Sequence, residues 1–263
     1  MAGLSGSLEL TTDRPRTPSR SDRGAWLGFT LPGELCEELR ALSRSNGATL
    51  YMTLLAAFQT LLHLYTGQDD IAVGSPIAQR DRPETEPLIG CLINTLVIRT
   101  DLSGDPSFTE LLARVRETTL GAYAHKDVPF ELLVEELQPA RRTNDTPFFQ
   151  TWFVLQNAPF GHLELPGLTL SPFVLASEAA QFDLALSMRE TESGLTGSVN
   201  YSTDLFDAET IEELISRLRV LLETIAAHPE RRLLAIHSQP EGDARLSTTP
   251  QHDTAQSEDQ FAF

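Results

Sequence analysis

An uncharged stretch over residues 47–68 constrains the fold of this chain more than any other feature. Apolar residues fall on nearly every side of a helix drawn over residues 49–65, so such a helix must be enclosed by other elements or by lipid. Polar side chains such as Gln59 and His63 interrupt the stretch, which is unfavourable for a membrane span. The stretch therefore predicts the central helix of a soluble protein, with no membrane as a partner.

Helical and strand patterns alternate along the rest of the chain. Apolar residues at helical spacing predict further helices over residues 33–45, 108–124, 129–137 and 207–227. Runs of β-branched and aromatic residues predict strands over residues 26–31, 70–75, 92–100, 148–156, 168–175, 182–190 and 195–201. The last two strands form a hairpin around Ser193 and Gly194. This mixture predicts an α/β fold, a two-layer sandwich of a mixed sheet and helices.

One folded unit over residues 25–237 accounts for these elements. Residues 1–24 mix proline with Arg, Ser and Thr, which is typical of a linker, and they lack the apolar run of a signal peptide. Residues 238–263 are polar and acidic and show no periodicity. We therefore expect a disordered acidic tail after the folded unit.

The composition excludes several classes of partner and cofactor. The chain has 20 basic and 37 acidic residues and a net charge of −17, whereas nucleic acids require a basic surface. Cys36 and Cys91 lack metal-ligand spacing, so we expect no metal site, no disulfide and a cytoplasmic location. No glycine-rich phosphate loop and no Gly-x-Ser-x-Gly elbow occurs. We therefore expect no bound cofactor.

His125 is the only histidine in a dense group of polar residues, over residues 125–131. In the interpretation that we favour, this group is a turn between two helices. Asp127 then caps the helix that Pro129 starts, and His125 closes the preceding helix. The alternative is that His125 acts as a catalytic base.

Asn94, Thr95, Arg99 and Gln150 form a second group of candidates. Asn94 and Thr95 lie inside an otherwise apolar strand, and a buried amide needs hydrogen-bond partners. Asn94 either ties two loops together or lines a substrate channel. We expect Arg99 to form a salt bridge at the end of this strand, and Gln150 to point to the same place as Asn94.

Three stretches resemble, in order, the later motifs of the condensation domain of nonribosomal peptide synthetases. Residues 89–95 are similar to Ile-Gly-x-Phe-Val-Asn-Thr, with Leu92 in place of the phenylalanine. Residues 125–131 match His-x-Asp-x-Pro-Phe-Glu. Residues 141–150 are similar to Arg-Asp-x-Ser-Arg-x-Pro-Leu-Phe-Gln, apart from Arg142, Asn144 and Asp145. Residues 8–16 also resemble the linker between the two lobes of such domains, and the likeness extends over about residues 8–236.

The resemblance implies one lobe only. The family's catalytic motif, His-His-x-x-x-Asp-Gly, belongs to the N-terminal lobe, and this chain has no adjacent pair of histidines. The family has two chloramphenicol-acetyltransferase-like lobes with a tunnel between them, in which an amine attacks a thioester carried on phosphopantetheine. By this resemblance the chain is the C-terminal lobe of an amide-forming acyltransferase and is inactive alone, without a catalytic residue.

The partners implied by the resemblance are an N-terminal lobe and peptidyl or acyl carrier proteins. The candidates for a tunnel wall or a structural motif are Asn94, Thr95, Arg99, His125, Asp127 and Gln150. Two other functions stay open. The chain is then a non-catalytic module that binds a carrier or another partner, or a stand-alone coenzyme A acyltransferase that uses His125.

Overall fold

The computed structural model describes residues 8–17, 21–80, 82–139, 146–156, 178–191 and 194–237. The predicted strand over residues 168–175 and the predicted disordered tail lie outside these residues, as do residues 141–145 of the third motif.

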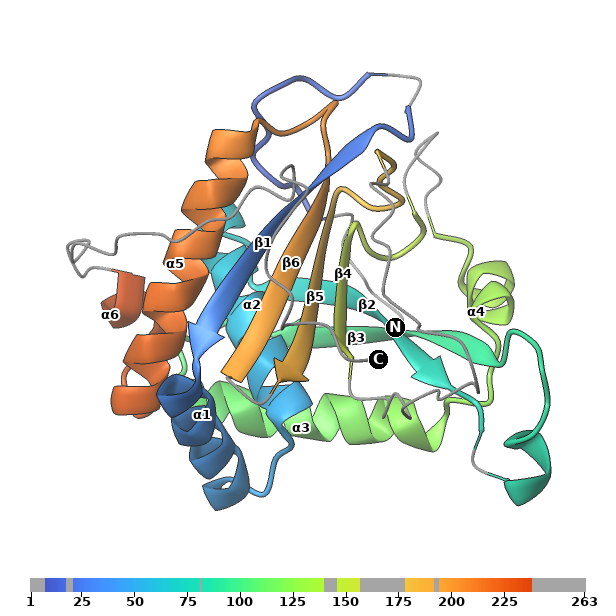
Figure 1. The fold of residues 1–263 in the computed structure, drawn as a ribbon, viewed down its shortest axis with the longest axis horizontal. Coiled ribbons are helices and arrows are strands. Elements are labelled where there is room, and N and C mark those ends of the chain that lie inside the picture. Colours follow the sequence, from blue (N-terminus) through green and yellow to red (C-terminus); the bar gives the residue numbers. More distant parts are fainter. Residues whose placement is uncertain are drawn as a thin grey trace, which may run out of the picture.

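A mixed six-stranded sheet forms one layer of the fold, with the strand order β1-β6-β5-β4-β2-β3 (Figure 1). Strands β2, β4 and β5 run parallel, and the other neighbours are antiparallel. The antiparallel pairing of β5 with β6 confirms the predicted hairpin. The strands are β1 (Gly24–Pro32), β2 (Asp70–Ala78), β3 (Ile93–Asp101), β4 (Thr151–Gln156), β5 (Leu184–Thr191) and β6 (Gly194–Ser202).

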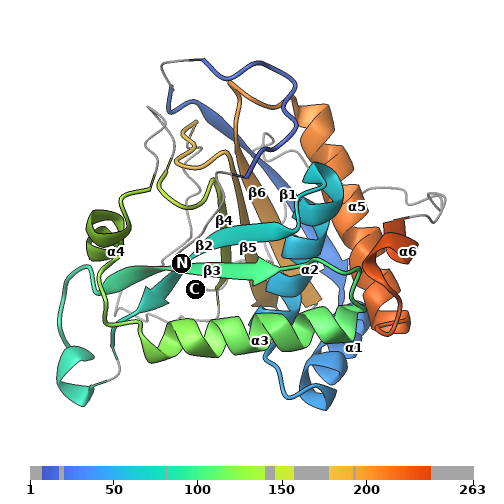
Figure 2. The same cartoon turned by 180° about the vertical axis from the view of Figure 1, so that it is seen from behind.

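Helices form the second layer. The helices are α1 (Gly33–Ser45), α2 (Leu50–Thr66), α3 (Phe108–Ala124), α4 (Phe130–Leu137), α5 (Ala208–Ala227) and α6 (Leu233–His237), with a short 3-10 helix, η1 (Pro83–Thr85). Residues of α1, α2, α3 and α5 share one large apolar core with the strands. Helix α4 lies apart from them and packs on a separate apolar cluster (Figures 1 and 2). The predicted α/β two-layer sandwich is confirmed.

Helix α2 is the centre of the helical layer, as its uncharged sequence predicts. Its residues from Met52 to His63 are buried. Gln59 is fully buried, and its Nε2 donates to the carbonyl oxygens of Ile71 and Ile98 at 3.4 and 3.2 Å. These bonds offset part of the cost of its burial, while its Oε1 has no hydrogen-bond partner among the described residues. No single helix in the described parts of the chain meets the length and hydropathy of a membrane span. Helices α1 and α2 meet them only as a pair that is bent by 103°.

Strand β4 begins later than the sequence pattern predicts. Phe148 has a φ of 72°, in the left-handed region that no strand adopts. Residues 148–150 are therefore irregular, with bends at Phe148 and Gln150, and regular pairing starts at Thr151. The aromatic run predicted a single strand because aromatic residues are common in strands, but buried aromatic residues such as Phe148 and Phe149 also occur outside a sheet.

Candidate functional site

Asn94 joins β3 to the turn between α3 and α4. Its Nδ2 donates to the carbonyl oxygens of Lys126 and Val128, both at 2.7 Å. Its Oδ1 accepts the backbone N–H groups of Thr95 at 2.8 Å and Phe130 at 3.2 Å. Only 8% of Asn94 is exposed, and both ends of its carboxamide are paired. The side chain therefore braces two segments that are more than 30 residues apart in sequence.

The same carboxamide caps helix α4. The N-cap residue of α4 is Pro129, which has no side-chain acceptor, and the helix begins at Phe130. The Oδ1 of Asn94 accepts the N–H of Phe130 in place of a local cap. The prediction that Asp127 caps this helix is wrong, because Asp127 lies two residues before the N-cap position and its side chain is exposed.

His125 is the C-cap residue of α3, which confirms its predicted position at the end of that helix. Its N–H donates to the carbonyl of Ala122, and its own carbonyl accepts the N–H of Val128, both at 3.1 Å. The side chain of His125 is exposed. Among the described residues, the turn meets Asn94 through backbone groups of Lys126, Val128 and Phe130 rather than through the imidazole of His125.

An aromatic cluster holds α4 on the second face of the sheet. Phe149 lies at its centre, with ring-centroid distances of 5.8 Å to Phe130, 5.9 Å to Trp152 and 5.6 Å to Phe182. Trp152 and Phe182 are stacked at 4.8 Å. A Cβ atom on Gly74 of β2 would lie 2.3 Å from the ring of Phe149, so only glycine fits beneath that ring.

Gln150 and Thr95 have different surroundings from Asn94. Gln150 is 4% exposed, and its Oε1 accepts the N–H of Leu8 at 2.7 Å while its Nε2 donates to the carbonyl of Thr146 at 3.3 Å. These partners differ from those of Asn94, so the two carboxamides hold different segments and the expected common position is not found. Thr95 is half-buried on β3, opposite Pro76 of β2.

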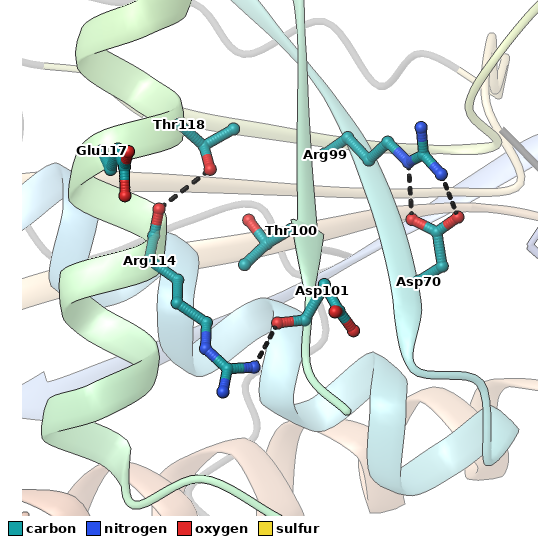
Figure 3. A pocket seen from close by; sticks show the side chains of 7 residues that line it. All are labelled: Asp70, Arg99, Thr100, Asp101, Arg114, Glu117 and Thr118. Carbon is teal, nitrogen blue, oxygen red and sulfur yellow. Dashed lines mark hydrogen bonds and ion pairs between the residues drawn. The ribbon is translucent and has the colours of Figure 1, made fainter. Parts of the chain in front are cut away.

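Arg99 forms the predicted salt bridge. Its Nε and Nη2 each contact one carboxylate oxygen of Asp70 at 2.8 Å, and this bidentate bond keeps the pKa of Arg99 above its ordinary value. The pair lies beside an open pocket of about 490 Å3 between β3 and α3, whose lining residues are all polar or charged (Figure 3). In α3, Arg114 donates to the carbonyls of Asp101 and Ser103.

A second pocket, of about 410 Å3, lies where β2 and β4 end and α2 begins. The Tyr51 hydroxyl donates to the Oγ of Ser75 at 2.8 Å inside it, and burial raises the pKa of that tyrosine. Apolar residues of β2 and β4 form much of the remaining wall, and Tyr123 of α3 closes one side. No sequence pattern indicated Tyr51, because a single tyrosine in an apolar helix is ordinary core composition.

The family model of the condensation domain matches residues 1–245 of the chain. The chain belongs to the condensation-domain family. It is 50% identical over 231 residues to a linear gramicidin synthase protein of Brevibacillus parabrevis, which covers 87% of this chain and 3% of that protein. It is 42% identical over 250 residues to the malpinin synthetase of Mortierella alpina, covering 94% of this chain and 3% of that protein. The chain therefore spans only a small part of the length of these relatives.

Solved structures agree on the fold of this condensation-domain chain. The X-domain from teicoplanin biosynthesis superimposes with a TM-score of 0.83 at 32% identity, covering 89% of this chain and 54% of that one. The condensation domain of the monacolin K polyketide synthase MokA gives a TM-score of 0.72 at 18% identity, covering 89% and 56%. The fold is chloramphenicol-acetyltransferase-like, as predicted, and the chain spans about half the length of these solved domains.

The polar side chains of Arg99 and Asn94 in this condensation-domain chain are engaged within the fold. Among the described residues, no three His, Cys, Asp or Glu side chains come together in a way that could hold a metal ion. Arg99 is engaged with Asp70, and Asn94 is engaged with backbone groups. These contacts position the β3 strand, the turn between α3 and α4, and the start of β2 relative to one another.

Proposed function

We propose that the chain is the C-terminal lobe of a condensation domain that forms amide bonds in nonribosomal peptide biosynthesis, and that it is inactive alone. The observation that carries this proposal is the match to the family over residues 1–245 together with a length of about half the solved domains. The absence of adjacent histidines from the sequence supports it. The substrates are acyl groups held as thioesters on the phosphopantetheine of carrier proteins, and the chain itself binds no cofactor.

The reaction that we propose needs positioning more than a reactive side chain. The amine nitrogen of one substrate attacks the thioester carbon of the other, so that a C–N bond forms and the C–S bond breaks. The thiolate of phosphopantetheine leaves, and the proton that the amine loses ends on this sulfur, so that the products are an amide and a free thiol. A thioester is already activated, so holding both substrates in register and stabilising the oxyanion supply much of the rate.

Two exposed apolar side chains on the loop between β2 and β3 support the need for a second lobe. The guanidinium of Arg80 donates to the carbonyl oxygens of Thr85, Glu86, Leu88 and Gly90, which fixes the loop between β2 and β3. This loop carries Leu88 and Ile89, of which Ile89 is fully exposed. Ile93, at the start of β3, is also exposed, and neighbouring exposed apolar side chains of this kind support a surface that a partner covers. We propose that the partner is the N-terminal lobe of the same domain.

Reconstitution tests the proposal. A matching N-terminal lobe that carries the paired histidines is added to the chain, and amide formation between two carrier-bound substrates is measured. We expect turnover only when both lobes are present. Turnover by the isolated chain above the uncatalysed rate would contradict the proposal.

A surface variant tests the docking of the two lobes in the same assay. Ile89→Lys should weaken association of the lobes, whereas Leu234→Lys, at an apolar exposed site on the distant helix α6, should not. Equal association constants for the two variants would show that the loop does not meet the N-terminal lobe.

The likeness to the X-domain favours a second candidate, a non-catalytic module that binds a partner. A solved complex contains that X-domain together with OxyB, and the X-domain in it is 32% identical to this chain with a TM-score of 0.82. The reconstitution separates the two functions, since a binding module associates without forming amide. The third candidate, a coenzyme A acyltransferase, requires His125 as a base, and acyl transfer from coenzyme A by the isolated chain would identify it.

A further inference from the structure

Residues 8–17, which we name the strap, precede β1 and lie against the end of the sandwich. Leu8 and Leu10 are buried in the large core. The backbone N–H of Leu8 donates to the Oε1 of Gln150, just before β4. The beginning of the strap is therefore part of the folded unit.

The end of helix α2 binds the next residues of the strap. The N–H of Glu9 donates to the Oε1 of Gln68 at 2.7 Å. The hydroxyl of Tyr65 donates to the carbonyl of Thr11, also at 2.7 Å. Both contacts join the strap backbone to the C-terminal end of α2, so the strap is fastened to a second element.

Asp13 caps helix α5 from outside that helix. Its Oδ2 accepts the N–H of Asp207 at 2.7 Å, and its Oδ1 accepts the hydroxyl of Thr210 at 2.9 Å. The N–H of Asp13 in turn donates to the carbonyl of Leu205 at 2.9 Å. A carboxylate at a helix N-terminus satisfies donors that the helix leaves unpaired and interacts favourably with its dipole.

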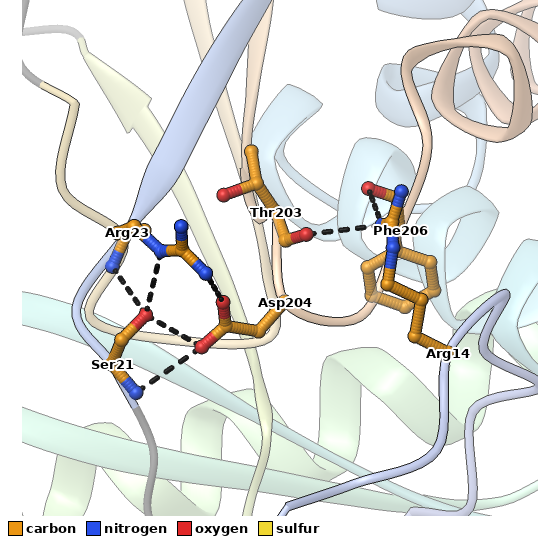
Figure 4. Close-up of polar contacts among 6 residues, drawn as sticks. All are labelled: Arg14, Ser21, Arg23, Thr203, Asp204 and Phe206. Carbon is orange, nitrogen blue, oxygen red and sulfur yellow. Dashed lines mark hydrogen bonds and ion pairs between the residues drawn. The ribbon is translucent and has the colours of Figure 1, made fainter.

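The side chain of the N-cap residue is used elsewhere. Asp207 forms no cap hydrogen bond, and its carboxylate instead contacts the guanidinium of Arg14. Arg14 also donates to the carbonyls of Thr203 and Phe206 at 3.0 and 3.1 Å (Figure 4). The strap and helix α5 thus bind each other in both directions. Asp13 of the strap accepts the N–H of Asp207, and the carboxylate of Asp207 contacts Arg14 of the strap.

The last part of the strap meets a buried carboxylate. Arg16 contacts Asp183, whose side chain is 3% exposed and precedes β5, at 2.6 Å. Further along, Ser21 and Arg23 both bind the carboxylate of Asp204 (Figure 4). The described residues before β1 are therefore fastened at several points, which lie on different elements.

We infer that the strap is one cooperative strut, in which Gln150 and Asp13 are the positioning residues, rather than a flexible linker. Contacts at the starts of β4 and β5, at the end of α2 and at the start of α5 fix its path, so it releases as a unit. Movement between this lobe and any chain that precedes it is then not taken up within residues 8–17. Gln150 serves the strap, and not a substrate.

Amide hydrogen exchange of the full chain tests this inference. Asp13→Ala removes the cap, and Gln150→Ala removes the acceptor for Leu8. If the strap releases as a unit, each variant raises the exchange rates of both the Leu8 and Asp13 amides by about tenfold. If each variant raises only the exchange of its nearest amide, the contacts are independent and the inference is wrong.

Two controls keep the result decisive. Glu209→Ala removes a carboxylate from the first turn of α5 for which the structure gives no contact with the strap, and it should leave the Leu8 amide unchanged. Where an alanine variant also raises exchange in the core strand β2, Asp13→Asn, which keeps one oxygen acceptor, is compared with it. An increase in the exchange rate of the Leu8 amide that exceeds the increase in β2 supports cooperative release of the strap, and an equal increase in both contradicts it.

Discussion

Replacing Asn94 with alanine should destabilise the isolated chain by about 2–3 kcal/mol. The variant removes two donors from the carbonyls of Lys126 and Val128 and one acceptor from the N–H groups of Thr95 and Phe130. A buried polar group left without a partner costs about 1–3 kcal/mol. Water reaches the half-buried turn and replaces part of these bonds, which is why the four losses do not add in full.

The loss can be measured by thermal unfolding. In a chain of this size about 1 kcal/mol corresponds to about 2–4 °C in Tm, so Asn94→Ala should lower Tm by about 4–12 °C. Asn46→Ala is a matched control, because Asn46 binds only nearby groups at the end of α1 and should cost less than about 1 kcal/mol. Amide exchange should increase first in α4, which loses its cap.

The same variant distinguishes a structural role of Asn94 from a role in binding the substrate. In the reconstituted two-lobe enzyme, the single-turnover rate of amide formation should fall no further than the loss of folded chain explains. An unchanged Tm combined with a large loss of rate would refute the reasoning, since Asn94 would then act on the substrate first.

Single contacts support three other expected outcomes. Gly74→Ala should cost about 1–3 kcal/mol in urea unfolding because its Cβ would meet Phe149, whereas Gly121→Ala, in an open helical position, should stabilise by about 0.5–1 kcal/mol; equal effects would contradict this. The backbone N–H of Ser107 keeps the pKa of Glu110 below its ordinary value of 4.5, so the stability that this carboxylate gives is present above that pKa and is lost as the pH falls through the lowered one. Glu110→Gln should therefore flatten the pH dependence of Tm in that acid range, and an unchanged profile would disprove the contribution. His125→Ala should leave amide formation by the reconstituted enzyme within about twofold of the parent, because its exposed side chain lies at a helix end, and a loss of about a hundredfold or more would make it a general base.

Local chemistry made much of this fold predictable. The uncharged sequence of α2 predicts its central position, and the Ser107 and Glu110 pair forms a capping box at the expected start of α3. The salt bridge of Arg99 followed from its place at the end of a strand. The first two features depend on residues that are close in sequence or on burial alone. For Arg99 only the ion pair was predictable, because its partner Asp70 lies 29 positions away on β2.

Long-range polar contacts could not be predicted in the same way. The cap of α4 comes from Asn94 on another element, and no spacing pattern connects residues 94 and 130. The strap resembles a linker in composition because polar groups fasten it, and their partners are up to 197 positions away. The bend at Phe148 depends on a left-handed backbone that its aromatic side chain does not indicate.

Because the cap of α4 comes from Asn94 on β3, this helix depends on tertiary contacts for its stability. An isolated helix of eight residues is too short to persist in water. The acceptor for its first N–H is Oδ1 of Asn94 on β3, so α4 has that bond only when the turn after α3 lies against β3. We therefore expect α4 to open at a lower free energy than the helices and strands of the large core.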